Sequence, residues 1–251
     1  SHVLLMRREA YDADLPQPVC CLTAGVDVQD DRFEVLVWGW APGEEAWLVD
    51  RQVIPGDTSR PEPWDALTQL LDHAYTHTTG HRLPIHAACI DSAGHRTTLV
   101  YDYAAQRAAR RLYATIGRDG ERPIVSSPSP RRWGRNERQV PLYTVGVDAA
   151  KALFVSRLRL TKAGPGFVHL PIAEWCDDEL AEQLTSERLV MTWSKGVPRQ
   201  VWRKRRARNE GLDCAVLAIA ALRLLNPKLQ AMSDALTAAP IGGGPGTPTP
   251  T

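Results

Sequence analysis

Hydrophobic and polar positions near the start of the chain predict three short strands. Residues 22–27 are small or apolar, residues 33–41 alternate between apolar and other positions, and residues 46–54 form a third apolar segment. The QDDR segment between the first two is typical of a tight turn, because Asp side chains hydrogen-bond to nearby turn backbone, and PGEE forms a second turn. We therefore expect an antiparallel three-stranded meander.

The rest of the chain alternates between helical and strand patterns. We expect a helix over 61–77, a buried strand over 84–91 parallel to the first strand, a helix over 92–111 with Ser92 as N-cap, and a strand over 112–117. Residues 118–138 are polar, basic and rich in Pro and Gly, which predicts a long loop. We next expect a strand that passes into a helix near 146–148, a strand over 166–171 and a helix over 173–187. A hairpin over 188–205, turning at Lys195–Gly196, and an apolar helix over 209–225 should follow.

This order of elements predicts an α/β fold. Three antiparallel strands followed by helix, strand, helix and strand are typical of the ribonuclease H-like mixed sheet, in which parallel strands follow the antiparallel ones and helices flank the sheet. We expect residues 1–20 to form a linker or strap and residues 21–228 to form the single domain. Residues 229–251 should be a disordered low-complexity tail.

Three acids stand at matching places in these elements. Asp27 lies in the first strand, Asp91 ends the strand over 84–91, and Asp213 lies near the start of the last apolar helix. Adjacent strands would bring Asp27 and Asp91 together, and the helix would lay Asp213 across them. Clustered carboxylates repel one another and need a cation, and their oxygens suit Mg²⁺. The pattern therefore predicts a metal site, where two ions can clamp the attacking and leaving oxygens of a phosphodiester.

Each acid also has a structural interpretation. An acid at a strand end is often a helix cap or a member of an ion pair, and Asp213 alone would favour a helix N-terminus. Glu210 shares the helical face of Asp213 and is either an auxiliary ligand or a surface acid. His95 follows Asp91 closely, and it either assists a water or a phosphate or is a hydrogen-bonded structural histidine.

Two basic clusters are candidates for binding a DNA backbone. The first runs directly into the helix of Asp213 and comprises Arg203, Lys204, Arg205, Arg206 and Arg208. The second lies in the 118–138 loop and comprises Arg131, Arg132, Arg135 and Arg138. The net charge of the chain is only +1, so any attraction for phosphates must come from such local patches. The alternative is that these charges only solvate a surface.

Other features narrow the functional classes. The sequence has no G-x-x-x-x-G-K-[ST] loop for ATP and no G-x-S-x-G nucleophile motif. Its five cysteines form no C-x-x-C pair, which argues against a zinc site and, without secretory features, favours a reducing cytosol. No apolar run has membrane-spanning length. The chain begins with SHV and its first methionine is Met6, which favours a fragment of a longer protein.

Several segments together resemble a known family. TAGVDVQDDRFEV, ACIDSAGHRTTLVYDY, VGVDAAKALFVSRL and RRARNEGLDCAVLAIAALRLL are similar to the C-terminal nuclease domain of the phage terminase large subunit, in the lambda-like family, and the resemblance covers roughly residues 22–226. It implies a ribonuclease H-like fold with Asp27, Asp91 and Asp213 as the metal-binding acids. The same subunit would carry an N-terminal packaging ATPase, which fits the missing ATP loop.

The resemblance also implies double-stranded DNA as the substrate. The enzyme would cut concatemeric viral DNA at the start and end of genome packaging, in the cytoplasm of the bacterial host cell, with the small terminase subunit and the portal as partners. We expect two Mg²⁺ or Mn²⁺ ions and in-line attack on the phosphorus by a metal-bound water or hydroxide.

Two alternative functions stay open. One is another ribonuclease H-like nuclease, of the junction-resolvase or transposase type, and the other is a non-catalytic DNA-binding or docking module.

Overall fold

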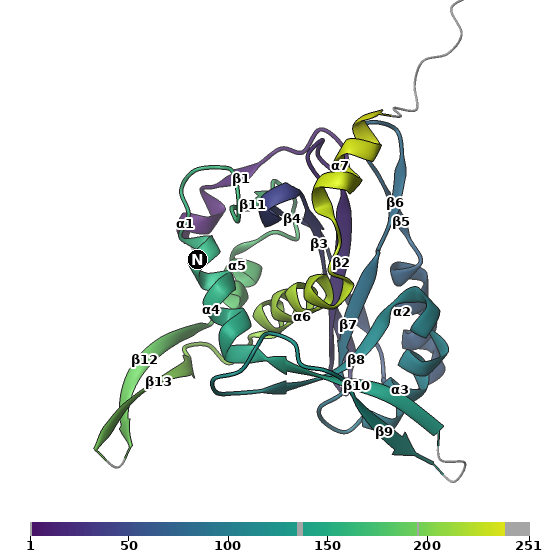
Figure 1. Ribbon diagram of the computed structural model, residues 1–251, viewed down its shortest axis with the longest axis vertical. Helices are drawn as coiled ribbons and strands as arrows, with labels where there is room; N and C mark the ends of the chain where they lie inside the picture. The colour runs from purple at the N-terminus through teal and green to yellow at the C-terminus, as the bar shows by residue number, and fades with distance from the viewer. Residues whose placement is uncertain (1, 135–137, 195, 239–251) are drawn as a thin grey trace, which may run out of the picture.

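The centre of the computed structural model, which describes residues 2–134, 138–194 and 196–238, is a nine-stranded mixed sheet (Figure 1). The strands lie in the order β1-β11-β4-β3-β2-β7-β8-β10-β9. Their bounds are Arg8–Glu9 (β1), Val168–Pro171 (β11), Ala46–Pro55 (β4), Arg32–Trp40 (β3), Cys21–Val28 (β2), Ala87–Asp91 (β7), Leu112–Arg118 (β8), Arg138–Gly146 (β10) and Ser129–Trp133 (β9).

The middle of the sheet agrees with the sequence pattern. β2, β3 and β4 pair antiparallel in chain order, so the predicted meander is confirmed. β7 lies on the other side of β2 and runs parallel to it, and β8 and β10 continue in the same direction. The chain therefore has a mixed α/β fold in which parallel strands follow an antiparallel unit.

Helices cover both faces of this sheet (Figure 1). One face carries α4 (Val147–Leu158), α5 (Asp178–Leu184) and α6 (Glu210–Leu225), and the other carries α2 (Pro61–Leu71) and α3 (Thr97–Gln106). Alternate residues of β3 serve the two layers, because successive strand side chains point to opposite faces. Trp38 belongs to the core under α6, whereas Val37 belongs to the core under α2 and α3.

Three predicted helices, over 61–77, 92–111 and 173–187, are shorter than their patterns indicated. The helix expected over 61–77 ends at Leu71, and Ala74–Thr76 forms strand β5, which pairs with β6 (Arg82–Pro84). Buried Tyr75 donates a hydrogen bond to Asp50 at 3.0 Å, so a tertiary contact overrides the helical pattern. The helix expected over 173–187 is reduced to α5, Asp178–Leu184.

Ser92 is not a helix N-cap, so that prediction is wrong. Helix α3 begins at Thr97, and the Ser92 hydroxyl instead donates to the backbone carbonyl of Thr115 at 2.7 Å. Gly94 has φ +97°, a left-handed conformation that interrupts any helix between Ser92 and Thr97. The helix is followed by a short 3-10 turn, η2, over Ala108–Arg110.

The segment 118–138 is not a loop throughout. Ser129–Trp133 forms β9, which pairs antiparallel with β10 and supplies an edge of the large sheet. Edge strands often carry polar and basic residues, because these discourage pairing with other chains. The same composition is typical of a loop, so the sequence pattern did not indicate a strand here. Residues 135–137, which include Arg135 of the second basic cluster, lie outside the described residues.

The ends of the chain are more ordered than predicted. Within the 1–20 segment, α1 (His2–Leu5) precedes β1, which pairs with β11, and Leu15 and Val19 are fully buried. The expected disordered tail begins instead with helix α7 (Leu229–Ala238), whose Met232 and Leu236 pack against the core. Residues 239–251 lie outside the described residues. No described helix has both the length and the apolar character needed to cross a bilayer.

A two-stranded hairpin projects from the body of the molecule (Figure 1). β12 (Glu187–Ser194) pairs antiparallel with β13 (Val197–Lys204), from Glu187 opposite Lys204 at its base to Ser194 opposite Val197 at its tip. The predicted hairpin is therefore confirmed. Lys195, half of the predicted turn, lies outside the described residues.

Candidate active site

Two of the predicted acids stand side by side on the central strands. β2 and β7 run parallel with Val26 opposite Ile90, and Asp27 and Asp91 are the next residues of each strand. Both acids therefore sit at the same level near the carboxyl ends of neighbouring strands, as predicted. Asp27 is only 6% exposed, and Asp91 is half-buried.

Helix α6 brings the third acid to the same place. It lies on β2 with almost no space between the backbones: a Cβ atom on Gly25 would stand 1.9 Å from the carbonyl oxygen of Cys214. The Thr23 hydroxyl also donates to the carbonyl of Ala218 at 2.8 Å. Only glycine permits this close approach, and it sets Asp213, in the first turn of α6, over the two strands.

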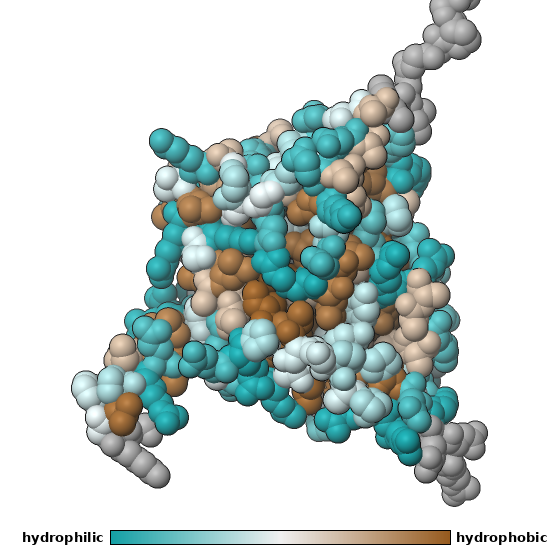
Figure 2. Space-filling model, in the orientation of Figure 1, coloured by the Kyte–Doolittle hydropathy of each residue, from teal (hydrophilic) through white to brown (hydrophobic). Residues whose placement is uncertain are grey.

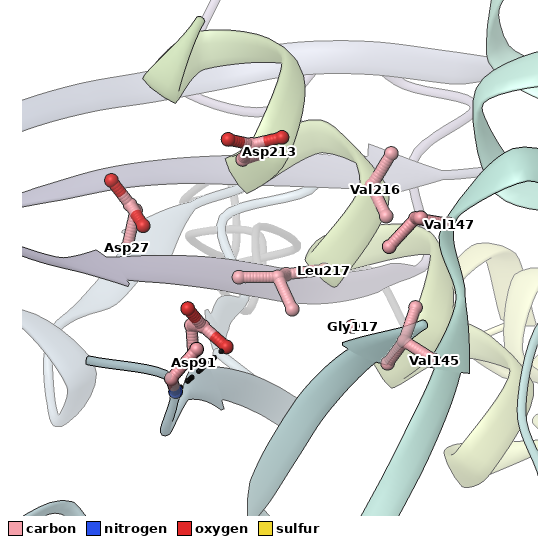
Figure 3. Close-up of a pocket in the computed structure, with 9 residues that line it drawn as sticks. Asp27, Asp91, Gly117, Val145, Val147, Asp213, Val216 and Leu217 are labelled. Atoms are coloured by element: carbon pink, nitrogen blue, oxygen red, sulfur yellow. Dashed lines mark hydrogen bonds between the residues drawn. The ribbon is translucent and has the colours of Figure 1, made fainter. Parts of the chain in front are cut away.

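The three acids line one pocket of about 200 Å³. In Figure 3 the carboxyl groups of Asp27, Asp91 and Asp213 gather at one side, and apolar side chains stand at the other. The remaining lining residues are Ala93, Gly117, Val145, Val147, Val216 and Leu217. The pocket thus combines a negative end with an apolar wall that limits contact with water.

The electrostatics of this pocket oppose ionisation of its acids. Burial raises the pKa of Asp27 to about 6, although a hydrogen bond from Gln29 counteracts the effect and the charge of Asp91 adds to it. Burial and the charge of Asp27 raise the pKa of Asp213 to about 7. Burial also raises the pKa of Asp91. Three such carboxylates are held ionised together most readily by a cation.

Each carboxylate accepts a hydrogen bond from a donor that the sequence pattern did not identify. Gln29 donates to Asp27 at 2.6 Å, the backbone N–H of Ala93 donates to Asp91 at 3.2 Å, and Asn209 donates to Asp213 at 2.7 Å. Gln29 and Ala93 follow their acids by two residues, and Asn209 precedes its acid by four, one helical turn. The four-residue spacing of Asn209 and Asp213 brings side chains together on a helix, so it could have indicated that contact.

The two auxiliary candidates lie outside the pocket lining. Glu210 is buried and forms ion pairs with Arg32 at 2.8 Å and Arg208 at 3.4 Å. His95 is highly exposed, and its Nδ1 lies 3.1 Å from a carboxylate oxygen of Asp30. Glu210 is thus a buried ion-pair partner rather than a surface acid, and its charge contributes to the raised pKa of Asp27, whereas His95 is a hydrogen-bonded surface residue.

The first basic cluster divides into engaged and unengaged residues. Arg206 pairs with Glu182 at 2.8 Å, Arg208 pairs with Glu34 at 2.5 Å and also with Glu179, and Lys204 donates to Asn209. Arg203 and Arg205 are exposed, and no ion pair joins either to a described residue. Three residues of the first basic cluster, which was predicted to bind DNA, therefore form contacts within the domain in this structure.

Side chains alternate between the two faces of the hairpin along each strand. The arginines Arg188, Arg199 and Arg203 share one face with Val190, Val197 and Val201, and Arg188 lies directly opposite Arg203. The other face is mainly apolar and carries Leu189, Met191, Trp193, Pro198 and Trp202. Of these, Leu189, Met191 and Trp193 are exposed. Figure 2 shows hydrophobic residues on this projecting hairpin.

The described members of the second basic cluster lie on the edge strand β9 and on its neighbour β10, and none of them lines the acid pocket. Arg131 and Arg132 are exposed on β9. Arg138 pairs with Asp102 at 2.6 Å, and Trp133 donates to the same carboxylate at 3.0 Å. The described part of this cluster is therefore a basic edge, partly anchored to α3.

The residues present could hold a hard cation, but the carboxylates do not form a complete shell by themselves. Among the described residues, no group of three or more His, Cys, Asp or Glu side chains is arranged to hold a metal ion. The shared pocket supplies three carboxylates, the ligand type that Mg²⁺ and Mn²⁺ favour. Mg²⁺ usually completes its shell with waters and substrate phosphates.

Comparisons with known proteins agree with the resemblance of the motifs. Residues 1–233 match the family described as "Terminase large subunit gpA, endonuclease domain". The chain is 36% identical over 244 residues to the terminase large subunit of Escherichia phage lambda, covering 95% of this chain and 37% of that protein. It is 35% identical over 229 residues to the terminase large subunit of Enterobacteria phage P21, covering 88% of this chain and 35% of that protein. The chain thus spans little more than a third of these relatives, and it belongs to the endonuclease-domain family of terminase large subunits.

Proposed function

We propose that this domain is a Mg²⁺- or Mn²⁺-dependent endonuclease that hydrolyses phosphodiester bonds of double-stranded DNA. The observation that carries the proposal is the convergence of Asp27, Asp91 and Asp213, from two strands and a helix, on one pocket. The strand order, with an antiparallel unit beside parallel strands, supports a ribonuclease H-like topology for the domain.

Asp27, Asp91 and Asp213 would hold two metal ions. The fit rests on the donor set: three carboxylates of raised pKa share a small pocket, so a divalent cation relieves both their repulsion and their desolvation. When bound, such ions activate water and stabilise negative charge on the phosphate that is attacked.

The remaining residues of the site orient the substrate and restrict water. Val145, Val147, Val216 and Leu217 form an apolar wall, which lowers the local dielectric constant and strengthens the interactions of the carboxylates. Arg203 and Arg205 would hold the DNA backbone near the acids, with Arg131 and Arg132 on β9 as a more distant basic edge. The juxtaposition of Arg188 and Arg203 supports this assignment, because like charges directly opposite are unfavourable until an anion lies between them.

The biological reaction that fits this family is cleavage of concatemeric viral DNA during genome packaging. The terminase large subunits of phages lambda and P21 are about three times as long as the region matched here. In this proposal a packaging ATPase of the same subunit, the small terminase subunit and the portal are the partners. The reaction takes place in the cytoplasm of the bacterial host.

A plasmid-cleavage assay tests the proposal. Supercoiled plasmid should be nicked and linearised with Mg²⁺ or Mn²⁺ and stay intact in EDTA, and Asp91→Asn should abolish cutting. Asp65→Asn is the matched control, because Asp65 is exposed on α2 and no ion pair joins it to a described residue. Equal cutting with and without metal would overturn the metal-dependent mechanism. Preference for a four-way junction over duplex would favour a resolvase.

A further inference from the structure

Asn209 occupies the N-cap position of α6 without capping the helix. An N-cap asparagine ordinarily accepts a hydrogen bond from a backbone N–H two or three residues ahead, but the Asn209 side chain makes no such bond. The backbone N–H of Gly211 is instead satisfied by the side chain of Gln183, from α5, at 2.8 Å. The amide of Asn209, which is only 8% exposed, therefore serves another contact.

That contact is with the pocket acid Asp213. The Nδ2 atom of Asn209 donates to Oδ2 of Asp213 at 2.7 Å and to Oε1 of Glu187 at 3.3 Å, while its Oδ1 accepts from Nζ of Lys204 at 2.7 Å. Both amide hydrogens face carboxylates and the amide oxygen faces an ammonium group. The reverse orientation would set the amide oxygen against two anions, so the amide has one favourable orientation.

The partners of Asn209 are themselves fixed by buried contacts. Glu187 accepts two hydrogen bonds from Lys151 of α4, at 3.0 and 2.9 Å, and both side chains are buried. Glu187 and Lys204 face each other at the base of the hairpin. Asn209 thus ties Asp213 to α4 and to both hairpin strands, whereas Oδ1 of Asp213 has no hydrogen-bond partner among the described residues.

We propose that Asn209 is a positioning residue, which fixes the Asp213 carboxylate so that its Oδ1 side faces the pocket. This inference rests on the proposed nuclease function. Side chains that orient metal-binding groups typically change metal affinity or activity by about 10- to 100-fold when they are removed. Asn209 would act on the metal through Asp213 and need not touch DNA.

The substitution Asn209→Asp separates this role from a structural one. Asp has nearly the same shape as Asn and is an equally good N-cap, and its charge suits a helix N-terminus. An Asn209 that served only as an N-cap would therefore make Asn209→Asp neutral or stabilising. The positioning role predicts a loss, because Asp offers no amide hydrogens and sets a third carboxylate beside Asp213 and Glu187.

The experiment compares the wild-type chain with Asn209→Asp, Asn209→Ala and a control at the other end of the same helix, Asn226→Ala. Asn226 is exposed with φ +45°, so its replacement weakens the helix end without reaching the pocket. Mn²⁺ affinity is measured by calorimetry without DNA, cleavage by single-turnover assay, DNA affinity in Ca²⁺, and stability by thermal unfolding.

We expect both Asn209 variants to lose about 10- to 100-fold in Mn²⁺ affinity and in single-turnover rate. Their DNA affinity should stay within about twofold of wild type, and Asn226→Ala should match wild type in all but stability. The positioning role would be overturned if Asn209→Asp kept its Mn²⁺ affinity and single-turnover rate within about twofold of wild type, or if it bound Mn²⁺ more tightly. A wild-type chain that binds Mn²⁺ but cuts no DNA would overturn the proposed function, and the titration would still decide the role of Asn209. A wild-type chain that neither binds Mn²⁺ nor cuts DNA in its presence would overturn both.

Discussion

The acid pocket and the β12–β13 hairpin hold their charges in opposite ways. In the pocket, three carboxylates are at least half-buried, and none forms an ion pair with a described residue. At the hairpin, cationic side chains are exposed to solvent, where a charge carries little desolvation penalty. The fold therefore imposes an electrostatic strain on the acids that it does not impose on the arginines.

This difference shows which charges need an explanation beyond solubility. Arg206 and Arg208 lie in the same basic run as Arg203 and Arg205, yet each reaches an acid of the body of the domain. A run of basic residues in the sequence thus contains both members of internal ion pairs and side chains that pair with no acid among the described residues. A cluster of buried acids that form no ion pairs is a stronger sign of a ligand than a run of exposed bases, because burying unpaired charges costs more free energy than exposing them.

The largest expected effect comes from removing one pocket charge. Asp27→Asn, Asp91→Asn and Asp213→Asn should each lower the plasmid-cleavage rate by at least about a thousandfold, since a lost charged ligand removes several kcal/mol of transition-state stabilisation. Circular dichroism should show an intact fold for all three. A near wild-type rate for any one of them would remove that residue from the metal site.

The second effect is on the packing that builds the pocket. Gly25→Ala would place its Cβ atom 1.9 Å from the Cys214 carbonyl oxygen and 2.9 Å from the backbone nitrogen of Ala218, so α6 must shift off β2. We expect a loss of about 3 kcal/mol or more in the free energy of unfolding, measured with urea.

Gly117→Ala is the matched control for Gly25→Ala. Its Cβ atom would meet only the end of the Val147 side chain, at 3.0 Å, so the loss should be smaller. Equal losses for the two variants would show that the close approach of α6 and β2 is not what Gly25 provides.

The acids could be located from sequence because each follows a local pattern. Asp27 and Asp91 end apolar strand segments, and Asp213 starts an apolar helix, so the elements themselves indicate where the acids stand. The central sheet was predictable for the same reason, since hydrophobic alternation and turn residues are local signals.

The contacts between distant segments could not be predicted in this way. Lys151 and Glu187 are 36 residues apart and meet only because α4 packs beside the hairpin base. The partner of Arg208, Glu34, lies 174 residues away in sequence. Edge strand β9 was missed because it is largely polar and basic, and helix α7 because it directly precedes a low-complexity segment. Pairing with β10 and packing on the core decide their structure.

A third prediction concerns the stability of the metal-free protein. Because burial and Asp27 raise the pKa of Asp213 to about 7, ionisation of this acid opposes folding, and its unfavourable effect grows as pH rises from about 4 through about 7. Asp213→Asn removes that effect. In EDTA the variant should gain stability relative to wild type, by up to about 2 kcal/mol more at pH 8 than at pH 5.

Thermal unfolding at the two pH values measures this difference. Asp65→Asn, on the exposed surface of α2, should show no such pH-dependent gain. If Asp213→Asn were no more stabilising at pH 8 than at pH 5, the pocket acids would not be electrostatically strained, and the contrast with the hairpin would fail.

The smallest effect is expected at the hairpin, where the charges are exposed and each substitution removes only one contact with the DNA backbone. Arg203 and Arg205 have no acid partner among the described residues, so they are the members of the basic run that are available to DNA. Neutralising both by Arg203→Gln and Arg205→Gln should flatten the log–log dependence of duplex-DNA affinity on salt by up to about 1.8, since each lost phosphate contact contributes about 0.9. The loss should be similar on unrelated DNA sequences, because phosphate contacts position the duplex without reading its bases.

Arg206→Gln is the control: its guanidinium already pairs with Glu182, and its removal should flatten the slope by clearly less. The measurement is affinity across a salt series in Ca²⁺, and an equal change for engaged and unengaged arginines would mean that internal pairing does not decide which cations meet the DNA.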